Sequence, residues 1–239
     1  MKLVFAGTRG CIEARSKRHR RHSALLVIHE RRRVLVDCGL DWLGRLEQLR
    51  PHAIVITHAH ADHIGGLALG ATVPVYATVE SWAALARYPL HRRKTIALRT
   101  PITIEGIRFE AFRVEHSILA PAVGYRIRAG RRIVFYAPDL IRIRNRRRAL
   151  SGVHLYVGDG ATLVRPILRR RDNALIGHAS IMTQLEWCAR EGVSRCIITH
   201  TGSHIVANEP AVIRRIRERG ADLGVDTGIA YDGMSLILR

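Results

Sequence analysis

The motif His-Ala-His-Ala-Asp-His, residues 58–63, constrains this chain more than any other feature of its sequence. It follows an apolar, strand-like run and supplies His58, His60, Asp62 and His63 within one tight loop. Such a loop directs His58 and His60 to one side, whereas Asp62 and His63 follow half a turn later and can face a second ion. Imidazole nitrogen and carboxylate oxygen suit zinc, manganese or iron, while calcium prefers oxygen ligands alone. The motif therefore predicts a site for transition-metal ions.

Several further motifs lie before and after this one, and their order along the chain resembles the order of motifs in the metallo-β-lactamase superfamily. The run 34–39 resembles the first motif of that family, in which an acid, here Asp37, orients a ligand histidine by a hydrogen bond. His116, Asp139 and His200 resemble the third, fourth and fifth motifs. The resemblance covers the chain from end to end.

This resemblance implies a centre of two divalent metal ions, with zinc as the first expectation and manganese as the second. Asp139 and Asp159 each follow an apolar strand, so either carboxylate could bridge the ions. Asp139 is preferred because it follows soon after the hairpin that carries His116. Carried over from the family, His58, His60 and His116 would hold one ion, Asp62, His63 and His200 the other, and Asp139 both.

The resemblance also implies an α/β fold, the metallo-β-lactamase-like four-layer αββα sandwich, with both metals at one edge where strand ends meet. Residues 1–239 are predicted to form a single hydrolase domain, because two-layered α/β folds often exceed about 200 residues. Periodicity predicts helices at 40–49, 79–87, 180–191 (N-capped by Ser180) and 209–219. Strands are predicted at 2–6, 23–28, 33–37, 53–57, 73–77, 103–114 (a hairpin), 122–127, 132–137, 153–157, 195–199, 228–231 and 235–238.

Within the superfamily, the closer resemblance is to ribonuclease Z and to the cyclic-phosphate phosphodiesterases of phosphonate breakdown. It rests on segments 7–10, 116–125 and 232–234, and on His178 in a Gly-His-Ala-Ser sequence. In that branch such a histidine faces the scissile phosphate and is backed by an acid, which here would be Asp159. The predicted catalytic residues are therefore His178, Asp159 and Asp62.

Two departures from this branch leave the substrate open. Ribonuclease Z proteins usually carry a long arm that grips transfer RNA, and no such insertion lies within 62–139. The phosphonate-pathway enzymes often have a cysteine-rich zinc knuckle near the N-terminus, where this chain has only Cys11. Neither substrate can be carried over directly.

A formal net charge of +19 favours an anionic partner by long-range attraction. Nucleic acid is the first candidate, and the run 142–148 is the segment most expected to contact it. The alternative is a general bias of the genome toward arginine, since only three of the 39 basic residues are lysines. Aromatic residues make up 5% of the chain, so contacts would be chiefly to phosphates. Arg9, Arg15 or Arg142 could line the pocket entrance. Basic clusters lie at 15–21, 31–33, 92–94, 142–148, 169–171 and 214–215.

The remaining cysteines and histidines indicate little further chemistry. Four cysteines without a CxxC pair predict buried thiols and no disulfide. No signal peptide or apolar run of about 20 residues is present in the sequence, which predicts a cytoplasmic protein without a membrane partner. His22 and His204 flank expected site loops. His19, His29, His52, His91 and His154 are expected at the surface.

These observations predict a dinuclear metal-dependent hydrolase that cleaves phosphodiester bonds, with a nuclease acting on RNA or DNA as the leading interpretation. One alternative is a phosphodiesterase of a small cyclic or nucleotide phosphate. Another is a thioester or lactone hydrolase, which would need neither His178 nor a basic surface. A metal-stabilised nucleic-acid-binding protein without turnover is a third. The predicted partner is an anionic phosphodiester; nucleic acid and a homodimer remain open.

Overall fold

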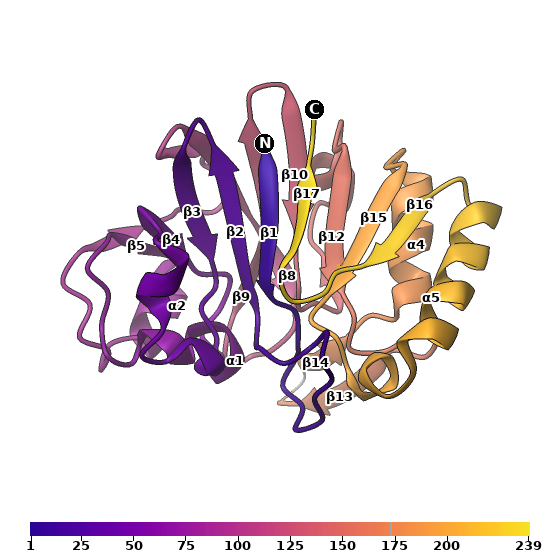
Figure 1. Ribbon diagram of the computed structural model, residues 1–239, viewed down its shortest axis with the longest axis horizontal. Coiled ribbons are helices and arrows are strands. Elements are labelled where there is room, and N and C mark those ends of the chain that lie inside the picture. Colours follow the sequence, from indigo (N-terminus) through magenta and orange to yellow (C-terminus); the bar gives the residue numbers. More distant parts are fainter. Residues whose placement is uncertain (173) are drawn as a thin grey trace.

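Two β-sheets packed face to face form the centre of the molecule, and helices cover the outer face of each sheet (Figure 1). The computed structural model describes residues 1–172 and 174–239. Separate groups of buried apolar side chains fill the spaces between the layers. This architecture confirms the predicted αββα sandwich. The helices are α1 (Ala61–Ile64), α2 (Val79–Ala84), α3 (Arg146–Leu150), α4 (Ile181–Arg190) and α5 (Ser203–Asp222).

The first sheet packs against α1 and α2. Its strand order is β17 (Met234–Ile237), β1 (Lys2–Gly7), β2 (Ala24–His29), β3 (Arg32–Val36), β4 (Ala53–Val55), β5 (Val75–Ala77) and β6 (Arg93–Thr95). Strands β17, β1, β2 and β3 pair antiparallel, whereas β3, β4, β5 and β6 pair in parallel. The parallel half therefore directs its carboxyl ends to one edge of the sheet.

The second sheet packs against α3, α4 and α5. Its strand order is β11 (Arg142–Ile143), β8 (Ile107–Glu115), β9 (Ala122–Ala129), β10 (Arg132–Tyr136), β12 (Leu155–Asp159), β15 (Arg195–Thr199) and β16 (Asp226–Ile229), and β7 (Ile102–Ile104) pairs with β8. Strands β10, β12, β15 and β16 are parallel. A separate hairpin, β13 (Ile167–Arg171) and β14 (Ala174–His178), was not predicted from the sequence.

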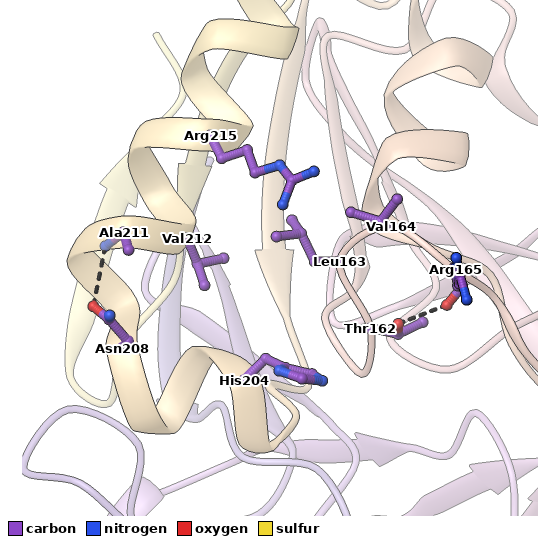
Figure 2. Close-up of a pocket in the computed structure, with 9 residues that line it drawn as sticks. All are labelled: Thr162, Leu163, Val164, Arg165, His204, Asn208, Ala211, Val212 and Arg215. Carbon is purple, nitrogen blue, oxygen red and sulfur yellow. Dashed lines mark hydrogen bonds between the residues drawn. The ribbon is translucent and has the colours of Figure 1, made fainter.

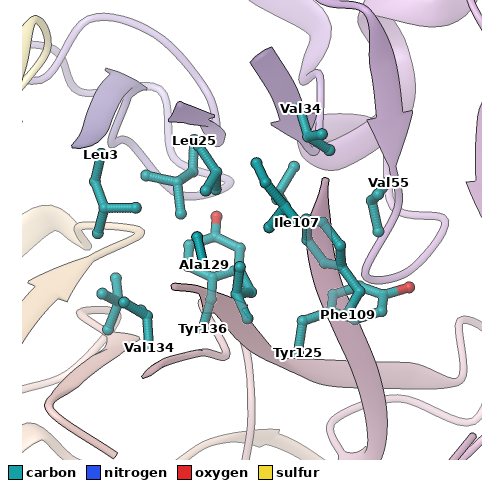
Figure 3. Close-up of a cluster of buried hydrophobic side chains, with 14 of the residues drawn as sticks. Leu3, Leu25, Val34, Val55, Ile107, Phe109, Tyr125, Ala129, Val134 and Tyr136 are labelled. Atoms are coloured by element: carbon teal, nitrogen blue, oxygen red, sulfur yellow. The ribbon is translucent and has the colours of Figure 1, made fainter. Parts of the chain in front are cut away.

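The central apolar core lies between the two sheets (Figure 3). Leu3 and Leu25 of the first sheet belong to the same buried cluster as Phe109 and Tyr125 of the second. The rings of Phe109 and Tyr125 meet edge to face with their centroids 5.9 Å apart. The Tyr125 hydroxyl also donates a hydrogen bond to the carbonyl of Ile56, at 2.7 Å. Each large apolar side chain buried here contributes roughly 1.5–3 kcal/mol, so this core fixes the two sheets against each other.

Several strands of both sheets end at one edge of the sandwich, which is the lower edge in Figure 1, where α1 and the β13–β14 hairpin also lie. Residues that follow neighbouring strand ends come close together in space, as in other α/β folds. Asp37 follows β3, His58 follows β4, Asp139 follows β10, Asp159 ends β12, and His200 follows β15.

The predicted helix at 40–49 is wrong. Two short 3₁₀ turns, Leu40–Trp42 and Leu46–Leu49, stand in its place. Gly44 lies between them with φ +68°, a left-handed conformation that interrupts a right-handed helix. Trp42 and Leu46 are buried in this segment. The apolar residues of this segment therefore belong to two separate turns that pack against the first sheet, and not to one helix.

Most other predicted elements are confirmed within a few residues. Strand β15 has the predicted bounds, and the Ser180 hydroxyl caps α4 by accepting a hydrogen bond from the amide of Thr183, at 3.1 Å. Helix α5 begins at Ser203 instead of at 209 because it consists of two segments joined by a kink at Asn208. The sequence pattern identified only the second segment, which has Pro210, a residue favoured near helix starts, in its first turn. No helix within the described residues is long and apolar enough to cross a membrane.

Candidate metal centre

The 58–63 motif spans the end of the loop after β4 and the start of α1, and a buried carboxylate holds it in place. Asp37 accepts hydrogen bonds from the Thr57 amide, at 2.8 Å, and from the Thr57 hydroxyl, at 2.9 and 3.0 Å. The Nδ1 atom of His63 lies 2.9 Å from the same carboxylate. Because a carboxylate only accepts, His63 donates through Nδ1 and keeps the lone pair on Nε2. Asp37 thus orients His63, as the family resemblance implied.

Three imidazoles converge on one point. His60 Nδ1 lies 3.1 Å from His58 Nε2 and 3.1 Å from His116 Nε2. The Nδ1 of His116 is 3.0 Å from the carbonyl oxygen of Gly177, to which it can donate, so its Nε2 lone pair faces the other two rings. A carboxylate oxygen of Asp139 completes this first ligand group.

A second group forms beside the first. Asp62 Oδ2 lies 3.0 Å from His200 Nε2 and 3.5 Å from His63 Nε2. His200 has a left-handed backbone, with φ 51°, a conformation that is uncommon outside glycine and gathers at functional sites. Gly10 packs against this ring: a Cβ atom added to Gly10 would lie 3.0 Å from its Cε1. The second ligand group is therefore built from α1 and from the residue that follows β15.

Asp139 lies between the two groups. Its Oδ2 atom is 3.6 Å from the Nε2 atoms of His58 and His200, and 3.7 Å from that of His63. Asp159, the alternative bridge, instead contacts His178, with Oδ2 2.8 Å from Nδ1. The geometry thus favours Asp139 in the position that the two groups share.

The donor set fits divalent cations. It comprises five imidazoles and two carboxylates that are all buried except His60, which is half-buried. Buried polar atoms normally have hydrogen-bond partners, yet His63 Nε2 has none within the described residues. It faces Asp62 and Asp139, where a bound cation would satisfy all three side chains. Nitrogen and carboxylate ligands of this kind suit zinc or manganese.

Protonation suits cation binding at His58 and His60, whereas at His63 and His200 the neighbouring carboxylates outweigh burial and raise the pKa. Burial, followed by the neighbouring His116, lowers the pKa of His60 to about 4, and burial lowers the pKa of His58 well below its usual value. Burial alone would raise the pKa of the Asp62 and Asp139 carboxyls, but the surrounding histidines bring both well below the usual range. Neutral imidazoles and ionised carboxylates are the forms that bind metals.

His178, at the end of β14, faces the same edge. Its Nδ1 atom is 2.8 Å from Asp159 Oδ2 and 2.9 Å from Asp139 Oδ1. Burial lowers the pKa of His178, but these two carboxylates outweigh burial and raise that pKa to about 10. Asp159 is itself fixed, because it accepts hydrogen bonds from the amides of Leu140, at 3.1 Å, and Ala161, at 2.8 Å. The two carboxylates therefore favour the protonated form of the ring, and Asp159 sets its orientation.

Gln184 is a residue of this site that sequence reasoning missed. Its Oε1 accepts hydrogen bonds from the Asp159 amide, at 2.8 Å, and from the Tyr156 hydroxyl, at 3.0 Å, and its Nε2 donates to the Asp159 carbonyl, at 2.8 Å. A signal was present. Gln184 shares the buried face of α4 with Ile181, Leu185 and Cys188, and a polar residue on an apolar helix face needs a partner.

Five of the seven candidate ligands line a cleft of about 650 Å³ together with His178; they are His60, Asp62, His116, Asp139 and His200. Arg169 of β13 is the single arginine among the lining residues that the structure describes. The three arginines predicted at the entrance are absent from that lining. Arg9 is buried and pairs with Asp41 at 2.7 Å, Arg15 pairs with Asp41 at 3.0 Å, and Arg142 pairs with Glu115 at 2.6 Å. The arginine in the cleft therefore comes from the unpredicted β13–β14 hairpin, and not from the segments of Arg9, Arg15 or Arg142, where the sequence had predicted it.

The charges of the run 142–148 are largely compensated within the fold. Arg142 and Arg144 both contact Glu115, Arg146 contacts Glu191 at 3.0 Å, and Arg148 lies 3.4 Å from Glu110. These pairs explain why so many arginines stand together here. They also leave this run with less free charge than its composition indicates.

Two further expectations are wrong. His19 is buried, with its Nδ1 atom 2.9 Å from the Thr8 hydroxyl and its Nε2 atom 3.3 Å from Glu209. Cys11 is exposed and lines the cleft, whereas Cys38, Cys188 and Cys196 are buried free thiols as predicted. Both errors concern the N-terminal loop, whose path depends on distant contacts. Asp232 holds this loop by accepting hydrogen bonds from the amides of Thr8, Arg20 and Arg21.

Comparison with known proteins agrees with this fold. The chain resembles YhfI from Bacillus subtilis, a metallo-β-lactamase fold protein, with 17% identity, 98% of each chain covered and a TM-score of 0.75. It is also similar to a diphosphatase from the PhnP family (19% identity, 100% of this chain and 98% of that chain, TM-score 0.71) and to the short form of human tRNase Z (19%, 100% of each chain, TM-score 0.67). A comparison with curated protein sequences gives no match. Residues 32–201 match the sequence profile of the β-lactamase superfamily domain. With its metallo-β-lactamase fold and its His/Asp clusters, the chain therefore belongs to the β-lactamase superfamily.

Proposed function

We propose that this protein is a hydrolase that uses two divalent metal ions to cleave phosphodiester bonds. The observation that carries the proposal is the position of His178: it lines the same cleft as both ligand groups, and Asp159 orients it. A thioester hydrolase has little need of a protonated group at this place, because a thiolate leaves readily without a proton. Phosphodiester cleavage does, because the departing oxygen must receive a proton.

Each ligand group would hold one ion. His58, His60 and His116 would bind the first, Asp62, His63 and His200 the second, and Asp139 would contact both. Two such ions, when bound, lower the pKa of water and neutralise charge on phosphoryl oxygens. We infer zinc as the first choice, because imidazoles outnumber carboxylates among the ligands, and manganese as the second.

The protein's own residues then orient the substrate and move the proton. His178 donates through Nδ1 to Asp159, which leaves the proton on Nε2 free for the leaving oxygen. Asp159 stays fixed because the Leu140 and Ala161 amides hold its two oxygens. Arg169, on the strand that pairs with the strand of His178, supplies a positive charge in the cleft, where it can bind a non-bridging phosphate oxygen.

Nucleic acid remains our leading proposal for the substrate, and a small cyclic or nucleotide phosphate is the second candidate. The net charge of +19 supports an anionic substrate in either case. The similar structures described as a diphosphatase and as tRNase Z agree with chemistry at phosphate. Compensation of the run 142–148 by acidic residues shifts the expected contact surface toward Arg169, which lines the cleft.

One comparison of substrates tests this function. Protein reconstituted with zinc, and separately with manganese, would be assayed with bis-p-nitrophenyl phosphate, an acyl thioester, an RNA or DNA oligonucleotide and a 2′,3′-cyclic nucleotide. We expect hydrolysis of the phosphodiesters and little or none of the thioester. Faster turnover of the thioester would contradict the proposal. No turnover of any substrate, together with tight oligonucleotide binding, would favour a binding protein instead.

A further inference from the structure

A second pocket adjoins the metal cleft. It has a volume of about 600 Å³ and lies between the 162–165 loop and α5 (Figure 2). His204, in the first turn of α5, lines both this pocket and the metal cleft. The two spaces therefore meet at one side chain, which stands close in sequence to the ligand His200. Pockets of this volume commonly bind small molecules.

The kink of α5 creates this pocket. Asn208 has φ −152° and ψ 65°, outside the helical region, and its side chain accepts a hydrogen bond from the Ala211 amide at 3.3 Å. This contact starts the second helical segment in a new direction. Asn208, Ala211, Val212 and Arg215 then recur at helical spacing, so one face of the segment points to the loop (Figure 2). The loop is closed by a hydrogen bond from the Thr162 hydroxyl to the Arg165 carbonyl, at 2.7 Å.

Apolar walls and basic side chains occur together in the second pocket. Leu163, Val164 and Val212 supply apolar surface, and Val164 is 44% exposed. Arg165 and Arg215 are both exposed, and no acidic residue is among the lining residues that the structure describes. Neither guanidinium forms an ion pair within that part of the chain. The run 142–148 differs, because its arginines are mostly paired.

We propose that the second pocket binds a phosphate-bearing organic group of the substrate. This group would belong to the part of the diester that extends from the metal cleft past His204 into the second pocket. This inference rests on the proposed phosphodiesterase function and makes its substrate class more specific. Arg165 and Arg215 would bind the second phosphate, since guanidinium groups match phosphate oxygens in geometry and charge. The apolar wall would contact the sugar or base. The substrate would then be a diester with a further phosphate about one nucleotide away, and not an isolated cyclic phosphate.

A matched pair of substrates tests the proposal. The p-nitrophenyl ester of thymidine 5′-phosphate has one phosphate, and the same ester with an added 3′-phosphate has two. We expect the 3′-phosphate to raise kcat/KM roughly tenfold to a hundredfold in the wild-type protein, because it would gain about one charged hydrogen bond. Arg215→Gln should abolish this preference.

Arg214→Gln is the matched control. Arg214 precedes Arg215 on the same exposed helix and does not line the second pocket. This variant should keep the preference for the 3′-phosphate. Equal kcat/KM values for the two esters in the wild-type protein would overturn the proposal. Equal losses in Arg214→Gln and Arg215→Gln would also overturn it, because they would indicate general charge and not a pocket.

Binding without turnover separates this proposal from the proposed function. Thymidine 3′,5′-bisphosphate, which contains no diester bond, would be titrated calorimetrically into the metal-loaded protein. We expect binding by the wild-type protein and by Arg214→Gln, and binding weakened at least tenfold in Arg215→Gln. Binding that is unchanged in Arg215→Gln would reject the pocket even if diesters are cleaved. Pocket binding in a preparation that cleaves no diester would reject the phosphodiesterase function alone.

Discussion

Gln184 holds the backbone of Asp159 from both sides: its Oε1 accepts from the Asp159 amide and its Nε2 donates to the Asp159 carbonyl, each at 2.8 Å. The end of β12 is thereby fixed to the buried face of α4. Since Asp159 in turn orients His178, a side chain that faces no substrate sets the position of the proposed acid. The contact between Gln184 and Asp159 is therefore expected to contribute both to stability and to turnover.

Replacing Gln184 by methionine should therefore affect both stability and turnover. The change keeps the approximate volume but leaves the Asp159 amide and carbonyl without partners. We expect the free energy of unfolding to fall by roughly 1–3 kcal/mol for each unpaired group, and kcat to fall more than KM changes. Denaturant unfolding and steady-state kinetics measure these quantities. Glu186→Gln, on the exposed face of α4, is the control; equal stability of the two variants would refute this role of Gln184.

His178→Ala should keep the metals and lose the chemistry. We expect phosphodiester turnover to fall by about 10² to 10⁴, the usual range for a lost general acid, with metal content unchanged. Kinetics and elemental analysis on one preparation measure both. His91→Ala, at an exposed position away from the cleft, is the control. Turnover at the wild-type rate would mean that His178 is purely structural.

Asp37→Asn should weaken metal binding without removing a ligand. An amide cannot accept from the Thr57 amide, the Thr57 hydroxyl and His63 Nδ1 as the carboxylate does, so His63 loses its fixed orientation. The expected loss of zinc affinity is about 10- to 100-fold, and competition with a chromogenic chelator measures it. Asp226→Asn changes an exposed carboxylate and should have no effect. Equal affinities in both variants would count against the assignment of His63.

Arg169→Gln should raise KM for phosphodiesters roughly tenfold to a hundredfold, because Arg169 is the guanidinium that lines the cleft. Neighbouring residues of a strand point to opposite faces, so Arg170→Gln is a matched control within β13. The ratio of KM values between the two variants decides the point. A ratio near one would show that the hairpin supplies only general positive charge.

The sequence predicted the parts of this site that local spacing determines. The 58–63 motif fixes four side chains within six residues, and His200 and Asp139 each follow an apolar strand that was identifiable by itself. The order of these motifs along the chain then led to the correct family and fold. Strand ends were predictable because apolar runs stop where polar residues begin.

Other features depended on contacts between distant segments, which spacing cannot reveal. Arg9 was expected at the pocket entrance, but Asp41, 32 residues later, draws it into a buried ion pair. Arg142 was expected there too and instead pairs with Glu115. The β13–β14 hairpin was missed because basic and apolar residues follow one another without a clear strand pattern at 167–172. Tertiary partners, and not composition, determine which arginines stay free for substrate.

Metal content is the most direct test of the two-metal centre. Protein reconstituted with zinc and freed of excess ion should contain about two equivalents per chain by elemental analysis, and crystals should show two anomalous peaks beside Asp139. Asp62→Ala should retain about one equivalent, held by His58, His60 and His116, because Asp62 belongs to the second group alone. One peak, or none, in the reconstituted wild-type protein would contradict the account.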